Sequence, residues 1–354
     1  MPVFQRDFML HQYIERESRR VYTEQLFADK AVRILYSRIR ESAPWVFKSL
    51  TGARFSKLMG TINYDGFLSE KTKGKLGLFT SRGIDLRECL DPPAQLDTLK
   101  KLFERKIRYW ECRPMPNDPG AVVSPSDARV LFGSFRETAA LFLKDKFFTF
   151  EELIATNKKR WLASLQDGDF AVFRLTPEKY HYNHNPVSGK VVDFYQIPGS
   201  YHACNPNAVV SVMTPYSKNK RVVTIIDSDV PGGNRVGLVA MIEVAALMIG
   251  DIHQCYSEKR YDNPVPIGSG MFVKRGVPKS LFRPGASTVV LIFQKGRVRF
   301  ADDIAANMTR SEVESIFSRV FGQPLVETDV QVRSFIASTC GRGEAQVKEY
   351  DAEQ

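Results

Sequence analysis

The chain has 354 residues, and its hydrophobic and charged fractions of 43% and 25% are ordinary for a soluble globular protein. The net charge of +10 favours an anionic partner such as nucleic acid, an acidic membrane surface or an acidic ligand, although a basic surface that aids solubility explains it equally well. Five dispersed cysteines without a CxxC pair argue against a zinc cluster and for a reducing compartment. The most apolar long run, 236–250, is too short to span a membrane. With no apolar signal segment at the N-terminus, we expect a cytoplasmic protein.

Residues 8–60 are expected to be helical, because apolar residues including Ile34, Leu35 and Ile39 recur at helical spacing. Basic residues then mix with Trp45, Phe47 and other large apolar residues, a pattern that suits a helix lying among lipid head groups. A helical layer packed on the rest of the molecule would give the same pattern. We expect residues 1–60 to form an amphipathic, membrane-associating region, and both interpretations stay open.

The chain from 61 to 120 is predicted to hold connecting loops and helices, with one helix near 97–106 and proline breakers on either side. From residue 121 the pattern changes to short runs of strand-forming residues separated by turn residues. These predicted strands are 121–123, 129–132, 171–175, 190–195, 209–213, 221–226, 236–240, 287–294 and 297–300. Helices are predicted at 149–155 and from the capping box at Thr309 to Glu312 through Phe321. The fold class is therefore α+β, with a β-rich domain over 121–341 and a polar tail over 342–354.

Three motifs stand out in this order. The first is the turn Ser124-Pro-Ser-Asp127, and the second is a block from Arg174-Leu-Thr-Pro through Tyr180-His181-Tyr-Asn-His184-Asn-Pro-Val-Ser-Gly189. The third is Gly285-Ala286-Ser287-Thr288, which precedes a strand-like run. Each motif alone is consistent with an ordinary turn or strand. Together they supply an Asp, a His and a Ser, the parts that activate a hydroxyl as a nucleophile.

From about residue 20 to about residue 340, the chain resembles the phosphatidylserine decarboxylase family, whose members make their own pyruvoyl group by cutting themselves at a Gly-x-Ser-Thr site. The string Pro186-Val-Ser-Gly189-Lys-Val-Val192 resembles the hairpins of lipoyl- and biotinyl-type domains, so we expect a barrel-sandwich-like catalytic domain. The family resemblance assigns three roles. His184 would take the proton of Ser287, Asp127 would orient His184, and the Ser287 hydroxyl would attack the carbonyl carbon of Ala286. The resulting ester would eliminate and hydrolyse, releasing ammonia and leaving fragments 1–286 and 287–354, the second beginning with pyruvoyl.

The resemblance also implies the later chemistry. The pyruvoyl carbonyl from Ser287 would form a Schiff base with the substrate amine and act as the electron sink for loss of carbon dioxide. His181 would then return a proton to the substrate carbon. Arg174 and Lys179 could meet a carboxylate or phosphate, or serve as solvated strand residues. His202 could line the pocket, or only anchor a turn.

Some positions depart from the family pattern. Ala286 stands where a glycine is usual, Ala128 follows Asp127 where the family has glycine, and Tyr182 replaces a frequent arginine. These changes spare Asp127 and Ser287. They bear on the efficiency of cleavage and on the shape of the pocket, and so on the head group or lipid that is accepted.

The implied function is decarboxylation of phosphatidylserine to phosphatidylethanolamine. The implied enzyme is a peripheral one on the cytoplasmic side of the cell membrane, built from its two fragments as a heterodimer. Pyruvoyl would be the only cofactor, with no metal and no nucleic-acid partner, and a homo-oligomer stays open. The alternative within the class is a pyruvoyl-dependent decarboxylase of a soluble amino acid or another serine lipid. A zinc hydrolase using Asp127, His181, His184 and His202 lacks a metal-binding signature, and a lipoyl-type carrier module lacks the expected lysine context.

Overall fold

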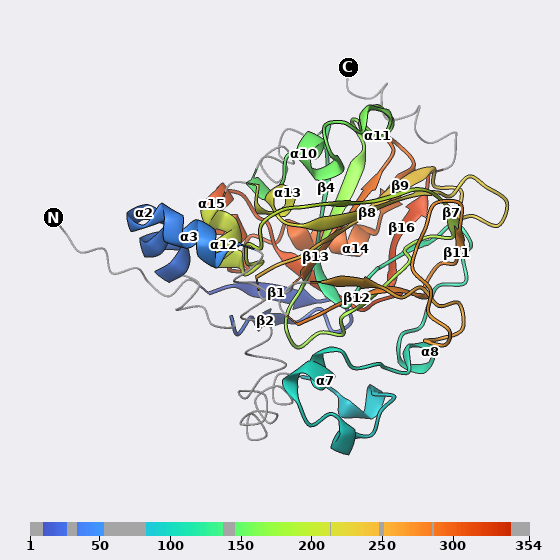
Figure 1. Ribbon diagram of the computed structural model, residues 1–354, viewed down its shortest axis with the longest axis horizontal. Helices are drawn as coiled ribbons and strands as arrows, with labels where there is room; N and C mark the ends of the chain where they lie inside the picture. The colour runs from blue at the N-terminus through green and yellow to red at the C-terminus, as the bar shows by residue number, and fades with distance from the viewer. Residues whose placement is uncertain are drawn as a thin grey trace.

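The computed structural model describes residues 10–26, 34–52, 83–136, 146–212, 214–247, 251–284 and 287–340. A ten-stranded sheet lies at the centre (Figure 1), with the strand order β11-β7-β8-β9-β13-β5-β4-β15-β1-β2. Apart from the parallel β1–β15 pair, neighbouring strands of this sheet in the described part of the chain are antiparallel. The strands are β1 Gln12–Glu15, β2 Val21–Thr23, β4 Ala128–Ser134, β5 Asp169–Leu175, β7 Gly189–Ile197, β8 Arg221–Asp227, β9 Leu238–Val244, β11 Phe272–Val273, β13 Ser287–Phe293 and β15 Glu327–Val330.

Two small sheets and a set of short helices complete the fold. One small sheet has the order β10-β12-β6 (Ile252–Gln254, Pro278–Phe282, Tyr182–His184), and the other has β14-β16-β3 (Val298–Phe300, Phe335–Thr339, Val122–Val123). The α-helices are α2 Arg40–Ser42, α3 Pro44–Leu50, α7 Leu99–Phe103, α8 Tyr109–Cys112, α10 Phe150–Ile154, α11 Lys159–Leu165, α12 Pro206–Ser211, α13 Pro215–Lys218, α14 Asp302–Met308 and α15 Ile316–Phe321. A π-helical turn, η1, spans Leu35–Ile39, and 3-10 turns, η4 and η5, span Leu86–Glu88 and Pro93–Gln95.

Strand β13 shows why the central sheet forms. Its sequence is continuously apolar after Thr288, and all seven residues are buried, as expected for a strand covered on both faces. Alternate residues point to opposite sides. Val289 and Leu291 join a core with residues of the small sheets, whereas Val290 and Ile292 join a core with residues of α10, α11 and α15. The sheet is thus sandwiched between a helical layer and the small sheets.

The sheet β10-β12-β6 brings the histidine block to the strand that carries Ser287. Strand β6 pairs with β12, with Pro278 opposite His184 and Leu281 opposite Tyr182. The Phe282 amide also donates to the His181 carbonyl at 3.0 Å. Because β12 ends at Phe282, five positions before Ser287, this pairing holds the block close to the start of β13.

The α+β class is confirmed, with an open sheet and no closed barrel in the described ranges. The expectation of a helical segment over 8–60 is wrong at 12–23, where β1 and β2 form a hairpin. Strand β1 adds to β15, more than 300 positions away, and this long-range pairing outweighs local helical spacing. Helices α2 and α3 project at one side of the molecule (Figure 1). In the part of the chain that the structure describes, no helix combines the length and hydrophobicity needed to cross a bilayer.

Two further expectations are wrong. The segment 209–213, predicted as a strand, belongs partly to helix α12, which begins after Asn205; the Asn205 side chain accepts a hydrogen bond from the Asn207 amide at 2.9 Å. The capping box at Thr309–Glu312 does not start a helix. Instead, α15 starts after Ser315, whose hydroxyl caps the Phe317 amide at 3.2 Å.

Candidate active site

Ser287 is the first residue of β13, which lies between β5 and β9. It stands opposite Leu175, and its hydroxyl is fully buried with no hydrogen-bond partner in the described residues. The hydroxyl of Thr288 also finds no hydrogen bond of normal geometry there. A buried hydroxyl without a partner is costly, which marks the start of this strand as a place with a chemical use. Gly285 and Ala286, and with them the predicted scissile bond, lie outside the described residues.

His184 is buried in strand β6 with both ring nitrogens engaged. Its Nδ1 lies 2.9 Å from the Gly276 carbonyl and its Nε2 lies 3.0 Å from the Tyr180 hydroxyl. Burial lowers the pKa of His184 to about 3, although the hydrogen bond to Gly276 opposes this, so the ring is neutral near pH 7. A carbonyl only accepts, so Nδ1 carries the proton and Nε2 presents the lone pair that a base needs.

Gly276 fixes this tautomer through its own backbone conformation. Its φ of +72° lies in the left-handed region that favours glycine. A Cβ at this position would collide with the sulfur of Met115. Any other residue at position 276 would be strained, so the carbonyl that orients His184 depends on this glycine.

Asp127 is held by an arginine rather than by the histidine. The Arg113 guanidinium donates to both carboxylate oxygens at 3.1 and 2.9 Å, and the Val332 amide donates at 2.7 Å. Arg113 also binds Glu88 through two bonds of 2.8 and 2.9 Å. Burial by itself would raise the pKa of Asp127, but the charge and hydrogen bonds of Arg113 lower it to about 2, so the carboxylate is ionised at neutral pH.

The turn that carries Asp127 is bonded to the histidine block through the main chain. The His184 amide donates to the Pro125 carbonyl at 2.8 Å, and the Ser126 hydroxyl donates to the Asn183 side chain at 2.6 Å. The two motifs are therefore neighbours, as the resemblance implied. The expected hydrogen bond between Asp127 and the ring of His184 is nevertheless absent among the described residues, because Arg113 and Gly276 occupy the groups that would form it.

His181 is fully buried, and its ring stacks on Phe103 with the centroids 3.5 Å apart. Neither of its ring nitrogens makes a hydrogen bond of normal geometry within the described residues, although a weaker contact with the Lys179 main chain opposes the lowering of its pKa. Burial lowers the pKa of His181 well below its usual value, and the nearby Arg105 guanidinium adds to this effect. In this arrangement the ring is neutral, so a role as proton donor requires a change in its surroundings.

Arg174 belongs to a buried ionic network. It pairs with Glu327 at 2.5 Å and with Glu24 at 2.6 Å, and His11 lies 2.8 Å from Glu327. The interpretation of Arg174 as a ligand-binding residue is not supported, because its guanidinium already forms ion pairs with two carboxylates of the chain. The cluster His11, Glu24 and Glu327 has the spacing of a metal site, but Arg174 and Arg129 bring positive charge to the same carboxylates, which opposes a cation there.

Two other residues flagged by sequence also have structural partners. Lys179 pairs with Asp329 at 2.6 Å. His202 stacks on Phe47 of α3 at 5.8 Å, and its amide donates to the Asn219 side chain at 2.7 Å. These contacts are those of a residue that anchors the turn, and the alternative that His202 lines the pocket stays a prediction.

A buried polar network next to the site was not foreseen. Lys279 of β12 pairs with Glu243 of β9 at 2.6 Å, and both side chains are fully buried. Asn183, between the two block histidines, donates to Glu243 at 3.3 Å and to the Ser280 hydroxyl at 3.1 Å. The network fastens β12 and β6 to the central sheet. Glu243 was visible in the sequence as the charge that interrupts the run 236–250.

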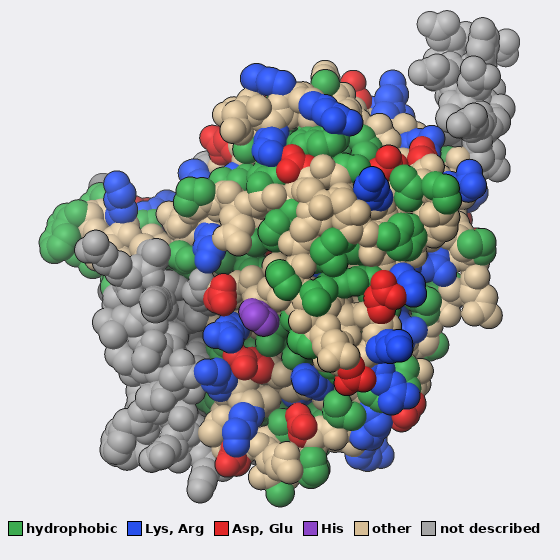
Figure 2. Space-filling model, turned by 45° about the vertical axis from the view of Figure 1, so that its right-hand side comes forward, with side chains coloured by type: hydrophobic (Ala, Val, Ile, Leu, Met, Phe, Trp, Pro, Cys, Tyr) green, Lys and Arg blue, Asp and Glu red, His purple; other side chains and the backbone are tan. Residues whose placement is uncertain are grey.

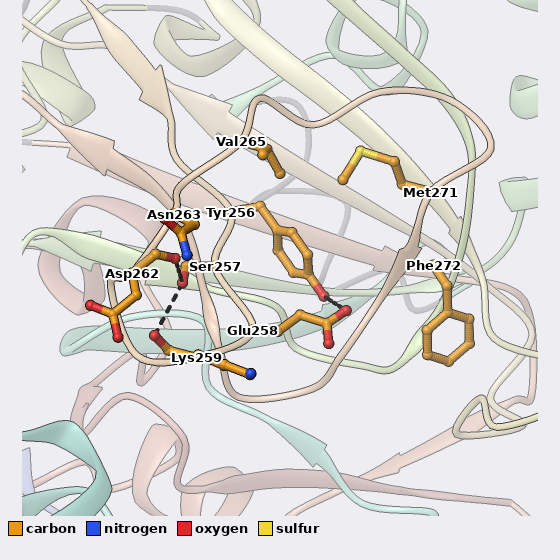
Figure 3. Close-up of a pocket in the computed structure, with 9 residues that line it drawn as sticks. All are labelled: Tyr256, Ser257, Glu258, Lys259, Asp262, Asn263, Val265, Met271 and Phe272. Atoms are coloured by element: carbon orange, nitrogen blue, oxygen red, sulfur yellow. Dashed lines mark hydrogen bonds between the residues drawn. The ribbon is translucent and has the colours of Figure 1, made fainter.

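A pocket of about 460 Å³ lies elsewhere, within the loop between β10 and β12. Figure 3 shows Tyr256 with its hydroxyl directed at Glu258, and Val265 and Met271 nearby. None of the candidate catalytic residues lines it. The buried groups around Ser287, and not this pocket, therefore define the candidate active site.

The buried serine at a strand start, the neutral histidine and the ionised aspartate define a candidate self-processing enzyme. A family model for phosphatidylserine decarboxylase matches residues 99–316. The chain belongs to the phosphatidylserine decarboxylase family.

Relatives in distant organisms agree with this assignment. The phosphatidylserine decarboxylase proenzyme of Fusobacterium nucleatum is 27% identical over 306 residues, which are 86% of this chain and 94% of that protein. The proenzyme of Chlamydia trachomatis is 28% identical over 82% of this chain and 90% of its own length. Phosphatidylserine decarboxylase proenzyme 2 of Oryza sativa subsp. japonica is 32% identical over 64% of this chain but only 34% of its own length. The chain thus spans nearly the whole of these two bacterial relatives and about a third of the rice protein.

Proposed function

We propose that the chain is a phosphatidylserine decarboxylase that cuts itself between Ala286 and Ser287 and converts phosphatidylserine to phosphatidylethanolamine and carbon dioxide. The observation that carries the proposal is the placement of Ser287. In a chain of this family, its hydroxyl is buried at the start of β13, directly after the predicted scissile bond, and has no hydrogen-bond partner among the described residues. The relatives are named proenzymes, which supports a chain that matures after synthesis.

In this proposal, the main-chain cut needs a base for the Ser287 hydroxyl. The Nε2 lone pair of His184 can accept the proton once Tyr180 gives up its hydrogen bond. The oxygen of Ser287 then bonds to the Ala286 carbonyl carbon as the peptide C–N bond breaks, and the freed nitrogen takes up the proton from His184. This step converts the amide to an ester. Elimination across the Cα–Cβ bond releases the carboxylate of Ala286. Water then replaces the nitrogen, which leaves as ammonia, and a pyruvoyl group remains at residue 287.

The residues present fit such a group. Residue 287 is buried between strands β5 and β9, so its carbonyl would be shielded from bulk water. The pyruvoyl ketone would supply the electron sink for decarboxylation. His181, which is tied to the end of β12 through its carbonyl, is the residue that we propose for returning a proton to the substrate. The two fragments would stay together because β13, in the second, pairs with β5 and β9 of the first.

We also propose that the protein works as a peripheral protein on the cytoplasmic side of the cell membrane. The support is the surface of α3, where Trp45 is 78% exposed and Lys48 is exposed beside it. Figure 2 shows apolar and basic side chains together on the projection at the left edge of the molecule. Aromatic and basic side chains on one exposed element suit the head-group region of an anionic bilayer.

Intact-mass spectrometry of the purified protein tests the self-cleavage. The expected result is two polypeptides, 1–286 and 287–354, the second with a pyruvoyl group in place of a free amino end. The Ser287→Ala variant should remain one uncut chain without decarboxylase activity, because no hydroxyl is left to attack Ala286. The control is Ser164→Ala, which removes a surface hydroxyl on α11 that bonds only the Arg160 carbonyl. An active enzyme recovered as a single intact chain would refute the proposal.

A further inference from the structure

Arg105 is a buried cation that forms no ion pair within the described residues, although the carboxylates of Asp127 and Glu88 lie near enough to act on its charge. It follows helix α7 and is only 6% exposed. Its Nη1 donates to the Leu102 carbonyl at 3.0 Å and its Nη2 to the Glu178 carbonyl at 2.8 Å. Both acceptors are neutral. Burial therefore lowers the pKa of Arg105, and three of its five N–H groups make no hydrogen bond in the described ranges.

Other buried arginines have either carboxylate partners or a hydrogen bond on every nitrogen of the guanidinium. Arg113 and Arg174 each meet two carboxylates. Arg221 has no carboxylate partner in the described part of the chain, but each of its three nitrogens donates to a carbonyl. Since a buried charge without a counter-charge is expensive, the arrangement around Arg105 suits a residue that receives an anion from outside the chain.

The surroundings place this cation at the proposed active site. Phe103, two residues before Arg105, stacks directly on the His181 ring. The carbonyl that Arg105 binds belongs to Glu178, three residues before His181. The positive charge of Arg105 is also close enough to lower the pKa of His181. Within the described residues, the ring nitrogens of His181 have no hydrogen bond of normal geometry and three N–H groups of Arg105 have none, so both groups belong to one buried polar region next to Phe103.

Two anionic groups of phosphatidylserine could meet Arg105, the carboxylate and the phosphodiester. A cation bound to the carboxylate would stabilise the charge that must disappear as carbon dioxide leaves, and so would oppose the reaction. The phosphodiester keeps its charge throughout, so an arginine bound to it stabilises substrate and transition state equally. Guanidinium groups also match phosphate oxygens with paired N–H donors.

We propose that Arg105 binds the phosphodiester of the phospholipid head group, an inference that rests on the proposed decarboxylation of phosphatidylserine. The phosphodiester occupies the free side of the guanidinium, while Leu102 and Glu178 hold the other side. The reacting carbon of the head group then lies towards His181. For this to happen, the ring of Phe103 moves off His181.

The test compares the processed wild-type protein with Arg105→Gln and Arg105→Lys, using dihexanoylphosphatidylserine as substrate. The inhibitor is dihexanoylphosphatidylethanolamine, which keeps the phosphodiester but lacks the carboxylate. For Arg105→Gln we expect KM and the inhibition constant to rise together by about 10- to 100-fold, as for loss of hydrogen bonds to a charged group. We expect kcat to change by less than about threefold, because Arg105 would bind the phosphodiester equally well in the bound substrate and in the transition state. The KM and inhibition constant of Arg105→Lys should lie between those of the wild type and those of Arg105→Gln. The matched control is Arg87→Gln, whose side chain is 92% exposed and paired with Asp85.

Each outcome separates the hypotheses. If KM rises while the inhibition constant stays unchanged, Arg105 binds the carboxylate and the phosphodiester assignment is wrong. If neither constant changes, Arg105 binds no substrate group. If Arg105→Gln does not fold, Arg105→Lys decides, since unchanged constants in that variant would overturn paired binding of the phosphodiester by the guanidinium. Wild-type protein that is never cut, or cut protein without activity on phosphatidylserine, refutes the proposed function itself and is visible before any Arg105 variant is measured.

Discussion

At the scale of single residues, the partner of Asp127 determines its charge and its orientation. Arg113 forms ion pairs with Asp127, which is buried, and with Glu88, which is partly exposed. If the guanidinium were removed, the negative charges of Asp127 and Glu88 would lose the positive charge that both of them pair with. Breaking a buried pair in this way costs about 3 to 5 kcal/mol. Arg113 therefore holds the turn that carries Asp127 in place and keeps the carboxylate ionised.

We predict that Arg113→Met lowers the free energy of unfolding by about 3 kcal/mol at pH 7. The measurement is urea denaturation in a Ser287→Ala background, where parent and variant are both uncut chains. Arg113→Lys should lose less, because an ammonium keeps the charge but cannot bind both carboxylates in the same bidentate way. Equal stability of Arg113→Met and its parent would mean that the ion pairs contribute nothing to holding this turn.

Motifs identified the candidate catalytic residues, but not all of their partners. Ser287, His181, His184 and Asp127 became candidates because they stand in short ordered patterns, and the structure brings the aspartate turn and the histidine block together. Arg113, Gly276 and Tyr180 were missed as partners, since each contact depends on how distant segments pack. Arg174 illustrates the opposite error. Its position in a motif suggested that it binds a substrate carboxylate or phosphate. Its partner Glu327 lies 153 positions away and could not be identified from local sequence.

At the scale of secondary structure, α3 differs from the other helices in what it leaves uncovered. Phe47 packs on Tyr36 and His202, which docks the helix on the turn before α12. Trp45 points away from this contact and is 78% exposed. One face of the short helix therefore anchors it, and the other is available to a surface.

We predict that Trp45→Ser weakens binding to anionic phospholipid vesicles by about tenfold or more, because the indole would lose its burial in the head-group region. Flotation of the full chain with vesicles of phosphatidylserine and phosphatidylcholine measures this. Val320→Ser on α15 is the control, since Val320 is also exposed, at 45%, but lies on another helix. If both variants bind like wild type, α3 does not attach the protein to membranes.

Helices and strands that depend on local sequence were predicted well, whereas those that depend on contacts with distant segments were not. Strands β4, β5, β8 and β13 were predicted close to their observed bounds, because each is a run of buried apolar residues. The hairpin β1–β2 was not, since its short strands are stabilised by pairing with β15. For α12 the signals were present in Asn205 and Pro206 at its start, but the β-branched residues that follow favoured a strand in a purely local reading.

For the molecule as a whole, burial of histidine makes stability depend on pH. Burial lowers the pKa of His184 to about 3 and those of His11 and His202 to about 4, and it lowers the pKa of His181 as well. In the unfolded chain these groups titrate near 6.5. Between these values the unfolded chain binds protons that the folded protein does not. The stability is therefore fully present above about pH 6.5 and falls as the pH decreases, by about 1.4 kcal/mol per pH unit for each such histidine.

His202 allows this to be tested with one substitution. Its ring stacks on Phe47, its Nδ1 has no hydrogen-bond partner in the described residues, and the charge of Lys218 also disfavours its protonation. Phenylalanine keeps the stacked ring and cannot bind a proton. In a Ser287→Ala background, we predict that His202→Phe reduces the slope of unfolding free energy against pH by about 1 kcal/mol per pH unit between about pH 5 and 6.5. Carboxylates contribute little in that window, because most titrate below it. Urea denaturation at several pH values gives the slopes, and identical slopes for parent and variant would show that His202 does not bind a proton on unfolding in this window.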